Sequence, residues 1–373
     1  MRIVVAPDKF KGSLGAAGVA GALAAGIHAE QPDWTVVEVP VADGGDGTVD
    51  AFVAAGWSAV EVEVDGPTGV PHPARYARRG DTAVVELAAA VGLVALPDGR
   101  PDALGASTFG LGQLLAHALD NGVTEIVLGL GGSASTDGGA GMLTALGARV
   151  LDRSGAPLGR GGAALLDAAA LDLGGLHPGT RSARFVLACD VDNPLLGPHG
   201  ATFVYGPQKG ADPDQLRILE SAMMRWGGIV TAATGSDVSL TRGVGAAGGT
   251  GFGAVAVLGA QSRAGIDIVL DLIGFDDVVA GADLVITGEG SIDEQTLHGK
   301  APVGVLAAAR RANLPVLVVA GRSLLDESYF LAAGFDKLYT LTAREPDARR
   351  SMANAAELLR AVGRDIAAGL EPT

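Results

Sequence analysis

The sequence predicts a two-domain α/β protein, in which both ends of the chain form one domain and the middle is inserted as another. Short apolar runs alternate with helix-forming segments near both termini, the middle holds three closely spaced strand-like runs, and 373 residues favour two domains over one. We expect residues 1–64 and 265–373 to form the first domain and residues 65–264 to form the insertion. We expect the active site in the cleft between them.

The N-terminal segment predicts a strand, a helix and a second strand. Residues 2–6 are an apolar run, and Ser13 is of a type that often caps a helix. The apolar residues after Ser13 recur at helical spacing and indicate one buried helix face. Residues 34–41 are the next strand-like run.

The middle of the chain has a different pattern. Three strand-like runs separated by turn sequences predict antiparallel pairing, at residues 60–64, 74–78 and 83–87. They are followed by a helix over about 111–119 and strands over 126–128 and 184–188. Asp212 is followed by Pro213, and Gln215 lies three residues after it. This pattern predicts the capped start of a helix. The glycine-rich residues 242–253 predict a hinge or a lid.

The C-terminal segment returns to alternation. Strand-like runs are found at residues 284–287, 315–320 and 338–341. A helix is predicted to begin at Pro302, and an amphipathic helix over residues 352–366 closes the chain. Together with the N-terminal elements, this order is typical of a Rossmann-like (flavodoxin-like) domain.

Composition excludes several classes of function. A net charge of −15 argues against nucleic-acid and anionic-membrane partners, which require a basic face. Cys189 is the single cysteine, so we expect no disulfide framework and a reducing, cytoplasmic location. No apolar run reaches the roughly 18 residues of a membrane span. We expect a monomer or homodimer that binds small molecules.

Five acidic, glycine-rich motifs follow five predicted strands. They contain Asp8; Asp43; Gly131, Gly132, Ser133, Ser135 and Asp137; Asp190; and Gly288, Glu289, Gly290 and Asp293. Open α/β sheets bind ligands outside the carboxyl ends of their strands, and glycine lets backbone amides approach an anion. The set predicts one shared site for phosphate chemistry. For each carboxylate, a structural turn or helix cap is the alternative.

Lysine usage supports the same site. Only five of the 27 basic residues are lysines, and four of them lie within glycine- or proline-rich motifs: Lys9, Lys11, Lys209 and Lys300. A compact ammonium suits a phosphate oxygen as a point charge. The alternative is that these are solvated loop lysines.

Several common enzyme motifs do not occur. The chain has no GxxxxGK[ST] phosphate loop, no GxGxxG fingerprint in a strand-to-helix context, no CxxC or HExxH and no GxSxG. Two alternatives to a kinase stay open: a nicotinamide-dependent dehydrogenase of a small hydroxy acid, and a non-catalytic module that binds a small anion.

The motifs as a set resemble one family. APDKFKGSL, PVADGGDGTVDA, GLGGSASTDGGAGML, ACDVDNPL, YGPQKGA and ITGEGSIDEQTLHGKAPVGV are similar to the class I glycerate kinase family, in order along the whole chain. The resemblance implies a glycerate 2-kinase that transfers the γ-phosphate of ATP, with Mg²⁺, to D-glycerate. The implied product is 2-phosphoglycerate, with 3-phosphoglycerate less favoured. The sequence departs from the family at Ser291, where arginine usually follows TGEG, and at Leu111 in STFGLG.

The resemblance and the residue chemistry together suggest roles. We expect Asp190 to accept the proton of the glycerate hydroxyl, with Asp192 as a weaker candidate. Lys11 and Lys300 are expected to act in catalysis from helix N-termini, which favour anions. Candidate Mg²⁺ ligands are Asp137, Glu289 and Asp293. Substrate and phosphate oxygens are expected at Asp8, Lys9, Asp43, Ser107, Gly131, Gly132, Ser133, Ser135, Lys209, Gly288 and Gly290.

Overall fold

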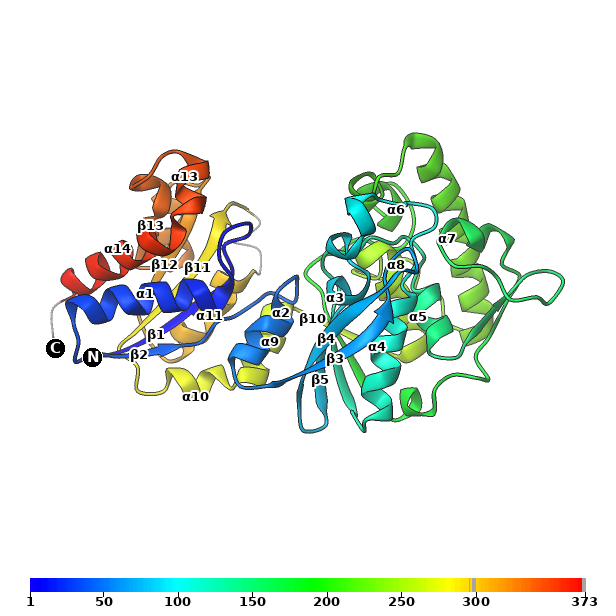
Figure 1. The fold of residues 1–373 in the computed structure, drawn as a ribbon, viewed down its shortest axis with the longest axis horizontal. Helices are drawn as coiled ribbons and strands as arrows, with labels where there is room; N and C mark the ends of the chain where they lie inside the picture. The colour runs from blue at the N-terminus through cyan, green and yellow to red at the C-terminus, as the bar shows by residue number, and fades with distance from the viewer. Residues whose placement is uncertain (295, 297–299, 371–373) are drawn as a thin grey trace. The chain divides into compact units, whose positions relative to one another are not determined.

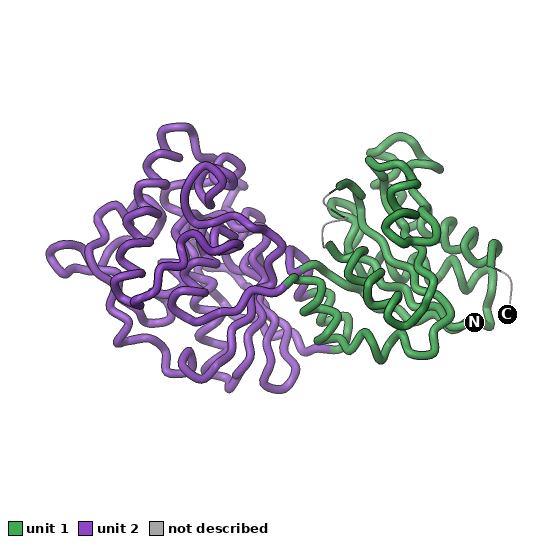
Figure 2. The backbone as a smooth tube through the Cα atoms, turned by 180° about the vertical axis from the view of Figure 1, so that it is seen from behind, with its two compact units in different colours: residues 1–43, 50–56, 264–373 green, residues 44–49, 57–263 purple. Residues whose placement is uncertain are grey.

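The computed structural model describes residues 1–294, 296 and 300–370 and divides the chain into two compact units. Unit 1 comprises Met1–Asp43, Asp50–Gly56 and Ala264–Thr373, and unit 2 comprises Gly44–Val49 and Trp57–Arg263 (Figure 2). Strands and helices alternate in both, so the predicted α/β class is confirmed. The strand Ser58–Asp65, which we had assigned to the first domain, pairs within the sheet of unit 2 because its partner strand lies there.

Unit 1 is built on a parallel sheet of five strands in the order β13-β12-β11-β1-β2. The strands are β1 (Arg2–Pro7), β2 (Thr35–Glu38), β11 (Leu284–Ile292), β12 (Val316–Ser323) and β13 (Lys337–Thr340). Counted within the unit, the order is 2-1-3-4-5, which is the flavodoxin-like arrangement predicted from the chain ends. Its topological switch point lies between β1 and β11.

Helices cover both faces of this sheet. The helices of unit 1 are α1 (Ala16–Glu30), α2 (Thr48–Ala54), α9 (Gly265–Ile273), α10 (Phe275–Val279), α11 (Ala301–Arg311), α12 (Glu327–Ala333), α13 (Ala348–Ala353) and α14 (Ala355–Ala368). α1 and α14 lie side by side over one face (Figure 1). They can approach closely because Gly26 has no side chain: a Cβ at this position would lie 2.1 Å from the Arg360 carbonyl oxygen. Val4 and Val285 are fully buried on the opposite face, toward α11.

Two predictions for unit 1 were wrong in detail. α1 begins at Ala16 with Gly15 as its N-cap, and the Ser13 hydroxyl donates instead to the Met352 carbonyl oxygen at 2.7 Å. The closing helix is interrupted at Asn354, which separates α13 from α14. The apolar spacing of residues 352–366 did not reveal this break, and Met352, the first residue of that pattern, is exposed.

Unit 2 contains a mixed sheet of six strands in the order β10-β9-β6-β5-β4-β3. The strands are β3 (Ser58–Asp65), β4 (Pro71–Arg79), β5 (Thr82–Glu86), β6 (Glu125–Gly129), β9 (Arg184–Ala188) and β10 (Gln261–Arg263). β3, β4 and β5 pair antiparallel, which confirms the prediction, and β5, β6, β9 and β10 pair parallel. A separate two-stranded antiparallel sheet, formed by β7 (Arg149–Leu151) and β8 (Ala170–Asp172), was not predicted.

The helices of unit 2 pack around a core that includes the fully buried Trp226. They are α3 (Leu87–Val91), α4 (Phe109–Asp120), α5 (Ala140–Ala145), α6 (Ala201–Tyr205), α7 (Pro213–Thr234) and α8 (Ala246–Leu258). Short 3₁₀ turns span Leu93–Ala95, Pro97–Gly99, Ala163–Asp167, Pro178–Arg181 and Pro207–Lys209, with another at Leu341–Ala343 in unit 1. The Asp212 side chain accepts bonds from the Asp214 and Gln215 amides, so the predicted capping box is confirmed.

The glycine-rich segment 242–253 does not form an exposed lid. Thr250 and Phe252 within it are fully buried, and Ala247, Gly248 and Gly249 have φ values of 54°, 65° and 84°. A Cβ on Gly248 would lie 2.1 Å from the Ser135 carbonyl oxygen, so this left-handed run lets two backbone segments touch. The glycines therefore serve close packing in the core of unit 2.

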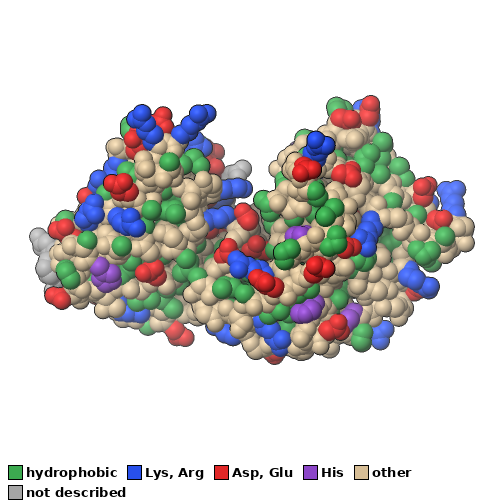
Figure 3. All heavy atoms as spheres, viewed as in Figure 1, with side chains coloured by type: hydrophobic (Ala, Val, Ile, Leu, Met, Phe, Trp, Pro, Cys, Tyr) green, Lys and Arg blue, Asp and Glu red, His purple; other side chains and the backbone are tan. Residues whose placement is uncertain are grey.

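Charged side chains of both signs are interspersed over the surface, as the face in Figure 3 shows. Among the helices of the described residues, none is both long enough and apolar enough to cross a membrane.

Candidate active site

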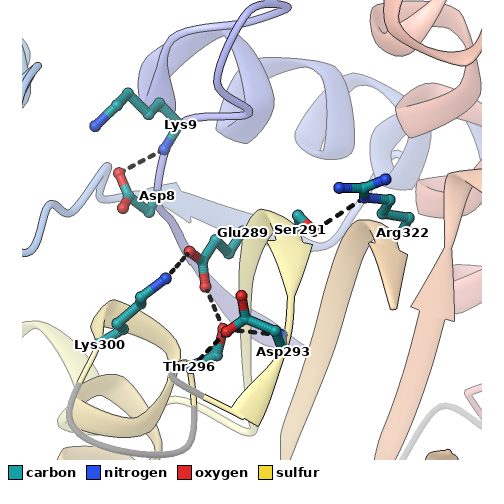
Figure 4. A network of polar contacts seen from close by, with 8 residues as sticks. All are labelled: Asp8, Lys9, Glu289, Ser291, Asp293, Thr296, Lys300 and Arg322. Carbon is teal, nitrogen blue, oxygen red and sulfur yellow. Dashed lines mark hydrogen bonds and ion pairs between the residues drawn. The ribbon is translucent and has the colours of Figure 1, made fainter. Parts of the chain in front are cut away.

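Acidic and basic side chains of unit 1 gather where β1 and β11 end, at the switch point of the sheet (Figure 4). The Asp8 amide donates to the Gly288 carbonyl oxygen at 2.8 Å, so Asp8 continues the pairing of β1 and lies beside Glu289. Asp8 Oδ1 accepts a bond from the Lys9 amide at 2.6 Å. Strand register thus places two carboxyl groups next to each other.

Glu289 is the centre of a hydrogen-bonded network. Its Oε1 accepts from Lys300 Nζ at 3.2 Å, and its Oε2 accepts from Thr296 Oγ1 at 3.0 Å. The Thr296 amide donates to Asp293 Oδ1 at 3.2 Å. Lys300 is the N-cap of α11, so its predicted place at a helix start is confirmed. Thr296 was missed because a threonine in a polar turn carries no distinctive signal.

Burial shifts the pKa values of the carboxyl groups in this cluster. Burial, helped by the nearby charges of Asp43 and Glu289, raises the pKa of Asp8 to about 7, although Lys9 opposes the shift. Burial also raises the pKa of Glu289, against the opposing effect of Lys300. Burial alone would lower the pKa of Lys300, but the surrounding carboxylates outweigh it and raise that pKa. Burial is therefore the main cause of the raised pKa of both carboxyl groups, and the neighbouring lysines oppose it.

Gly288 and Gly290 belong to β11, which continues to Ile292, so the predicted turn directly after Thr287 was wrong. A Cβ on Gly288 would lie 2.3 Å from the Val319 carbonyl oxygen, and one on Gly290 would lie 3.0 Å from Phe10 Cα. These glycines let the loop after β1 and the neighbouring strand β12 approach β11. Lys11 lies exposed in that loop, several residues before α1 begins.

In unit 2, the motif after β6 forms a loop that backbone hydrogen bonds join to the end of α3 and the turn after it. The Ala134 amide donates to the Val91 carbonyl oxygen at 3.1 Å, and the Leu93 amide donates to the Gly132 carbonyl oxygen at 2.9 Å. Gly132 has a φ of 72°, and Ser133 beside it is buried.

The DGGDGT motif packs against the start of this loop. A Cβ on Gly129 would lie 2.5 Å from the Gly44 carbonyl oxygen, and one on Gly131 would lie 2.9 Å from Gly45 Cα. Two of the predicted glycine-rich motifs are therefore in direct backbone contact within unit 2.

Asp137 is fully buried, and both of its carboxylate oxygens accept bonds from the protein. The donors are Thr108 N (2.8 Å), Thr108 Oγ1 (2.9 and 3.0 Å), Ser107 Oγ (3.3 Å), Gly139 N (3.2 Å) and Gly141 N (3.2 Å). Burial raises its pKa, and the Thr108 bonds partly offset this. Asp137 thus joins the start of α4 to the loop after β6, and the Ser107 hydroxyl is part of that junction.

Lys209 lies inside unit 2, with a relative exposure of 1%. Its Nζ donates to the Ser135 carbonyl oxygen at 2.5 Å, and burial lowers its pKa to about 7 despite the nearby Asp137. Within the described residues, the buried hydroxyls of Ser135 and Thr136 have no hydrogen-bond partner. Lys209 therefore supports the loop from within.

Asp190 is exposed and follows β9, which ends in register with Gly129 of β6 and Glu86 of β5. Asp190 and the loop after β6 consequently begin at the same edge of the sheet. Asp192 forms an ion pair with Arg242, which favours a structural role for it. Burial raises the pKa of the neighbouring Cys189 thiol, as expected for a packed cysteine.

Comparisons with known proteins agree along the full chain. The model of the Glycerate kinase family matches residues 3–371. A glycerate kinase of Bacillus subtilis (strain 168) is 44% identical over 374 residues, which cover 100% of this chain and 98% of that protein. A glycerate 2-kinase of Escherichia coli (strain K12) is 39% identical over 373 residues, covering 99% and 98%.

A solved structure agrees as well. A crystal structure from Salmonella typhimurium LT2, assigned as a glycerate kinase 2, superposes with a TM-score of 0.86 at 43% identity, covering 99% of this chain and 97% of that one. The protein therefore belongs to the glycerate kinase family.

Proposed function

We propose that the protein is an ATP-dependent kinase that phosphorylates D-glycerate and releases 2-phosphoglycerate. The observation that carries the proposal is the Asp8–Glu289–Lys300 cluster at the switch point of a flavodoxin-like sheet, in a chain of the glycerate kinase family. The family match gives no support to the dehydrogenase or to the non-catalytic module that the sequence left open.

Phosphoryl transfer requires positioning and neutralisation of charge more than covalent chemistry. Lys300 lies at the start of α11, where the helix N-terminus adds to its attraction for a phosphate oxygen. We assign Lys300 to the transferring phosphate, with Lys9 and Lys11 supplying further positive charge from the loop after β1. Glu289 holds the Lys300 ammonium in place through the 3.2 Å bond.

The donors of unit 1 fit Mg²⁺ better than those of unit 2. Carboxylates are the hard oxygen ligands this ion prefers, and Asp8, Asp43, Glu289 and Asp293 share one electrostatic environment. Burial is the main cause of the raised pKa of Asp8, and the nearby charges of Asp43 and Glu289 add to it, so a divalent cation bound among these carboxylates would lower that pKa. Asp137, in contrast, is fully buried inside unit 2, where its carboxylate joins two segments of the protein, whereas Glu289 is only partly buried.

No set of three or more His, Cys, Asp or Glu is arranged to hold a metal within the part of the chain that the structure describes. One or two carboxylates with phosphate oxygens are often sufficient for Mg²⁺. We therefore assign one or two carboxylates of this set as its ligands, where the ion would offset the charge of the nucleotide phosphates.

The acceptor hydroxyl requires a carboxylate that takes its proton. We assign this role to Asp190, which is exposed at the same sheet edge as the loop after β6. Backbone amides around Gly131, Gly132 and Ser133 are suited to an anionic group of the substrate. Lys209 and Asp137 maintain the shape of this loop from inside the unit.

The test is a coupled assay of ADP release with D-glycerate and a panel of other hydroxy acids, with and without Mg²⁺. We expect turnover to require ATP, D-glycerate and the metal, and we expect phosphorus NMR to show the 2-phospho ester. Absence of ADP release with every acid would refute the kinase proposal. Formation of 3-phosphoglycerate alone would refute only the position of transfer.

We also propose a cytoplasmic enzyme that is a monomer or homodimer. The single cysteine, with no disulfide partner in the sequence, is typical of a reducing compartment. Cell fractionation and light scattering of the purified protein test these two points.

A further inference from the structure

Arg322 on β12 lies directly beside Ser291 on β11. The two residues are register partners in the parallel pairing of these strands. Arg322 Nε donates to Ser291 Oγ at 3.0 Å, and Figure 4 shows both side chains at the same edge of the sheet as Glu289. The sequence did not predict this pair, because the strand-like run appeared to end at Ala320.

The guanidinium group of Arg322 retains most of its donors. Three other arginines of unit 1 pair with carboxylates: Arg310 with Asp336, Arg311 with Asp276 and Arg344 with Asp365. Arg322 is exposed, and among residues 1–294, 296 and 300–370 its acceptor is the Ser291 hydroxyl. Because a guanidinium has five N–H donors, the four on its terminal nitrogens are open to an external acceptor.

The position of Arg322 relates it to the Glu289 cluster. Alternate residues of a strand point to the same face, so Ser291 shares a face with Glu289, and Arg322 shares it through its register with Ser291. Figure 4 shows Lys300 and Arg322 on opposite sides of Glu289. Two cationic groups therefore flank the carboxylate cluster at the carboxyl edge of the sheet, which is where ligands of this fold bind.

We propose that Arg322 is an anion-binding residue of the active site, oriented by Ser291. The Ser291 hydroxyl accepts from Arg322 Nε, which leaves the terminal nitrogens of the guanidinium for a ligand. Its ligand is an oxyanion of a substrate, either a nucleotide phosphate or the carboxylate of the small acid. A planar guanidinium can bind a phosphate or a carboxylate through two parallel hydrogen bonds. The identity of the ligand rests on the proposed function, whereas anion binding does not.

The test uses equilibrium binding, measured by calorimetry with ADP and with D-glycerate in separate titrations. Charge-assisted hydrogen bonds contribute about 1.5–3 kcal/mol, so we expect Arg322→Ala to weaken the binding of one of the two ligands by about 10- to 150-fold. Loss of ADP binding identifies a phosphate as the ligand, and loss of D-glycerate binding identifies the carboxylate. Arg322→Lys should bind with intermediate affinity, because it keeps the charge and loses the planar fork.

Two further variants provide controls. The double variant Ser291→Arg/Arg322→Ser moves the guanidinium to the register partner on β11, and it should recover part of the lost affinity. Arg311→Ala removes an equally exposed arginine of unit 1 that already pairs with Asp276, and it should bind both ligands as the parent does.

Each outcome decides the proposal. If Arg322→Ala binds both ligands with the affinity of the parent, the proposal is overturned. A lower melting temperature in that variant would then indicate that Arg322 has a structural role alone. A parent protein that binds neither ligand would overturn both this proposal and the proposed function. If the parent binds ADP but does not phosphorylate glycerate, and Arg322→Ala loses ADP, the anion site stands and the kinase proposal fails.

Discussion

Replacement of Lys209 by methionine tests the buried charge beneath the loop after β6. Burial lowers the pKa of this lysine from 10.5 to about 7, so the unfolded chain binds more protons between these two values. Stability must therefore rise as the pH increases through this window. One pKa unit corresponds to about 1.4 kcal/mol, which gives a gain of about 3 kcal/mol between about pH 7 and about pH 9.5.

Lys209→Met removes this pH-dependent contribution, so the difference in stability between the variant and the parent is expected to change sign with pH. At neutral pH the variant avoids a burial cost on the order of 4 kcal/mol and loses one charge-assisted bond, to the Ser135 carbonyl oxygen, worth about 1.5–3 kcal/mol. We expect it to be slightly more stable than the parent near pH 7. Near pH 9.5 the parent has recovered most of the cost, so we expect the variant to be equal or less stable.

The assay is urea unfolding followed by the fluorescence of Trp226, in a background where Trp34 and Trp57 are phenylalanine. Trp226 Nε1 donates to the Gly138 carbonyl oxygen at 3.0 Å, so it reports on this loop. Lys337→Met is the matched control, because Lys337 is exposed. Parallel pH slopes in the parent and in Lys209→Met would refute the reasoning.

Three further predictions concern the proposed site. Asp190→Asn should lower kcat by about 10²–10⁴ with little change in KM for glycerate, and a folded variant that keeps more than about a third of the parent rate would exclude Asp190 as the base. Lys300→Met removes the ammonium group that donates to Glu289 Oε1, and we expect it to raise the KM for ATP by roughly tenfold. Initial-rate kinetics measure this, and an unchanged KM would contradict it. Gly248→Ala places a Cβ 2.1 Å from the Ser135 carbonyl oxygen at a residue with a φ of 65°. We expect the free energy of unfolding, measured with urea, to fall by at least about 2 kcal/mol. A fall of less than about 0.5 kcal/mol would contradict this prediction.

Local chemistry was sufficient to predict the class of fold and most of the elements, although not the β7–β8 pair or the break at Asn354. Apolar runs of strand length predicted β1, β9 and β12, and the Asp212 capping box predicted the start of α7. Strand spacing in the middle of the chain separated an antiparallel group from the parallel ends. The motifs also indicated which residues lie at strand ends, since Asp8, Gly131 and Asp190 each follow a buried strand.

Tertiary structure decided what each of these side chains contacts. Asp8 meets Glu289 only through the register of β1 with β11, and Asp137 finds its donors at Thr108, far earlier in the chain. Lys209 was expected at a substrate or phosphate oxygen, with a solvated loop lysine as the alternative, but the fold buries it and its Nζ donates to the Ser135 carbonyl oxygen. A polar turn has the same local pattern whether it is solvated, buried or bound to a ligand. Long-range pairing and burial select among these, and no short stretch of sequence contains that information.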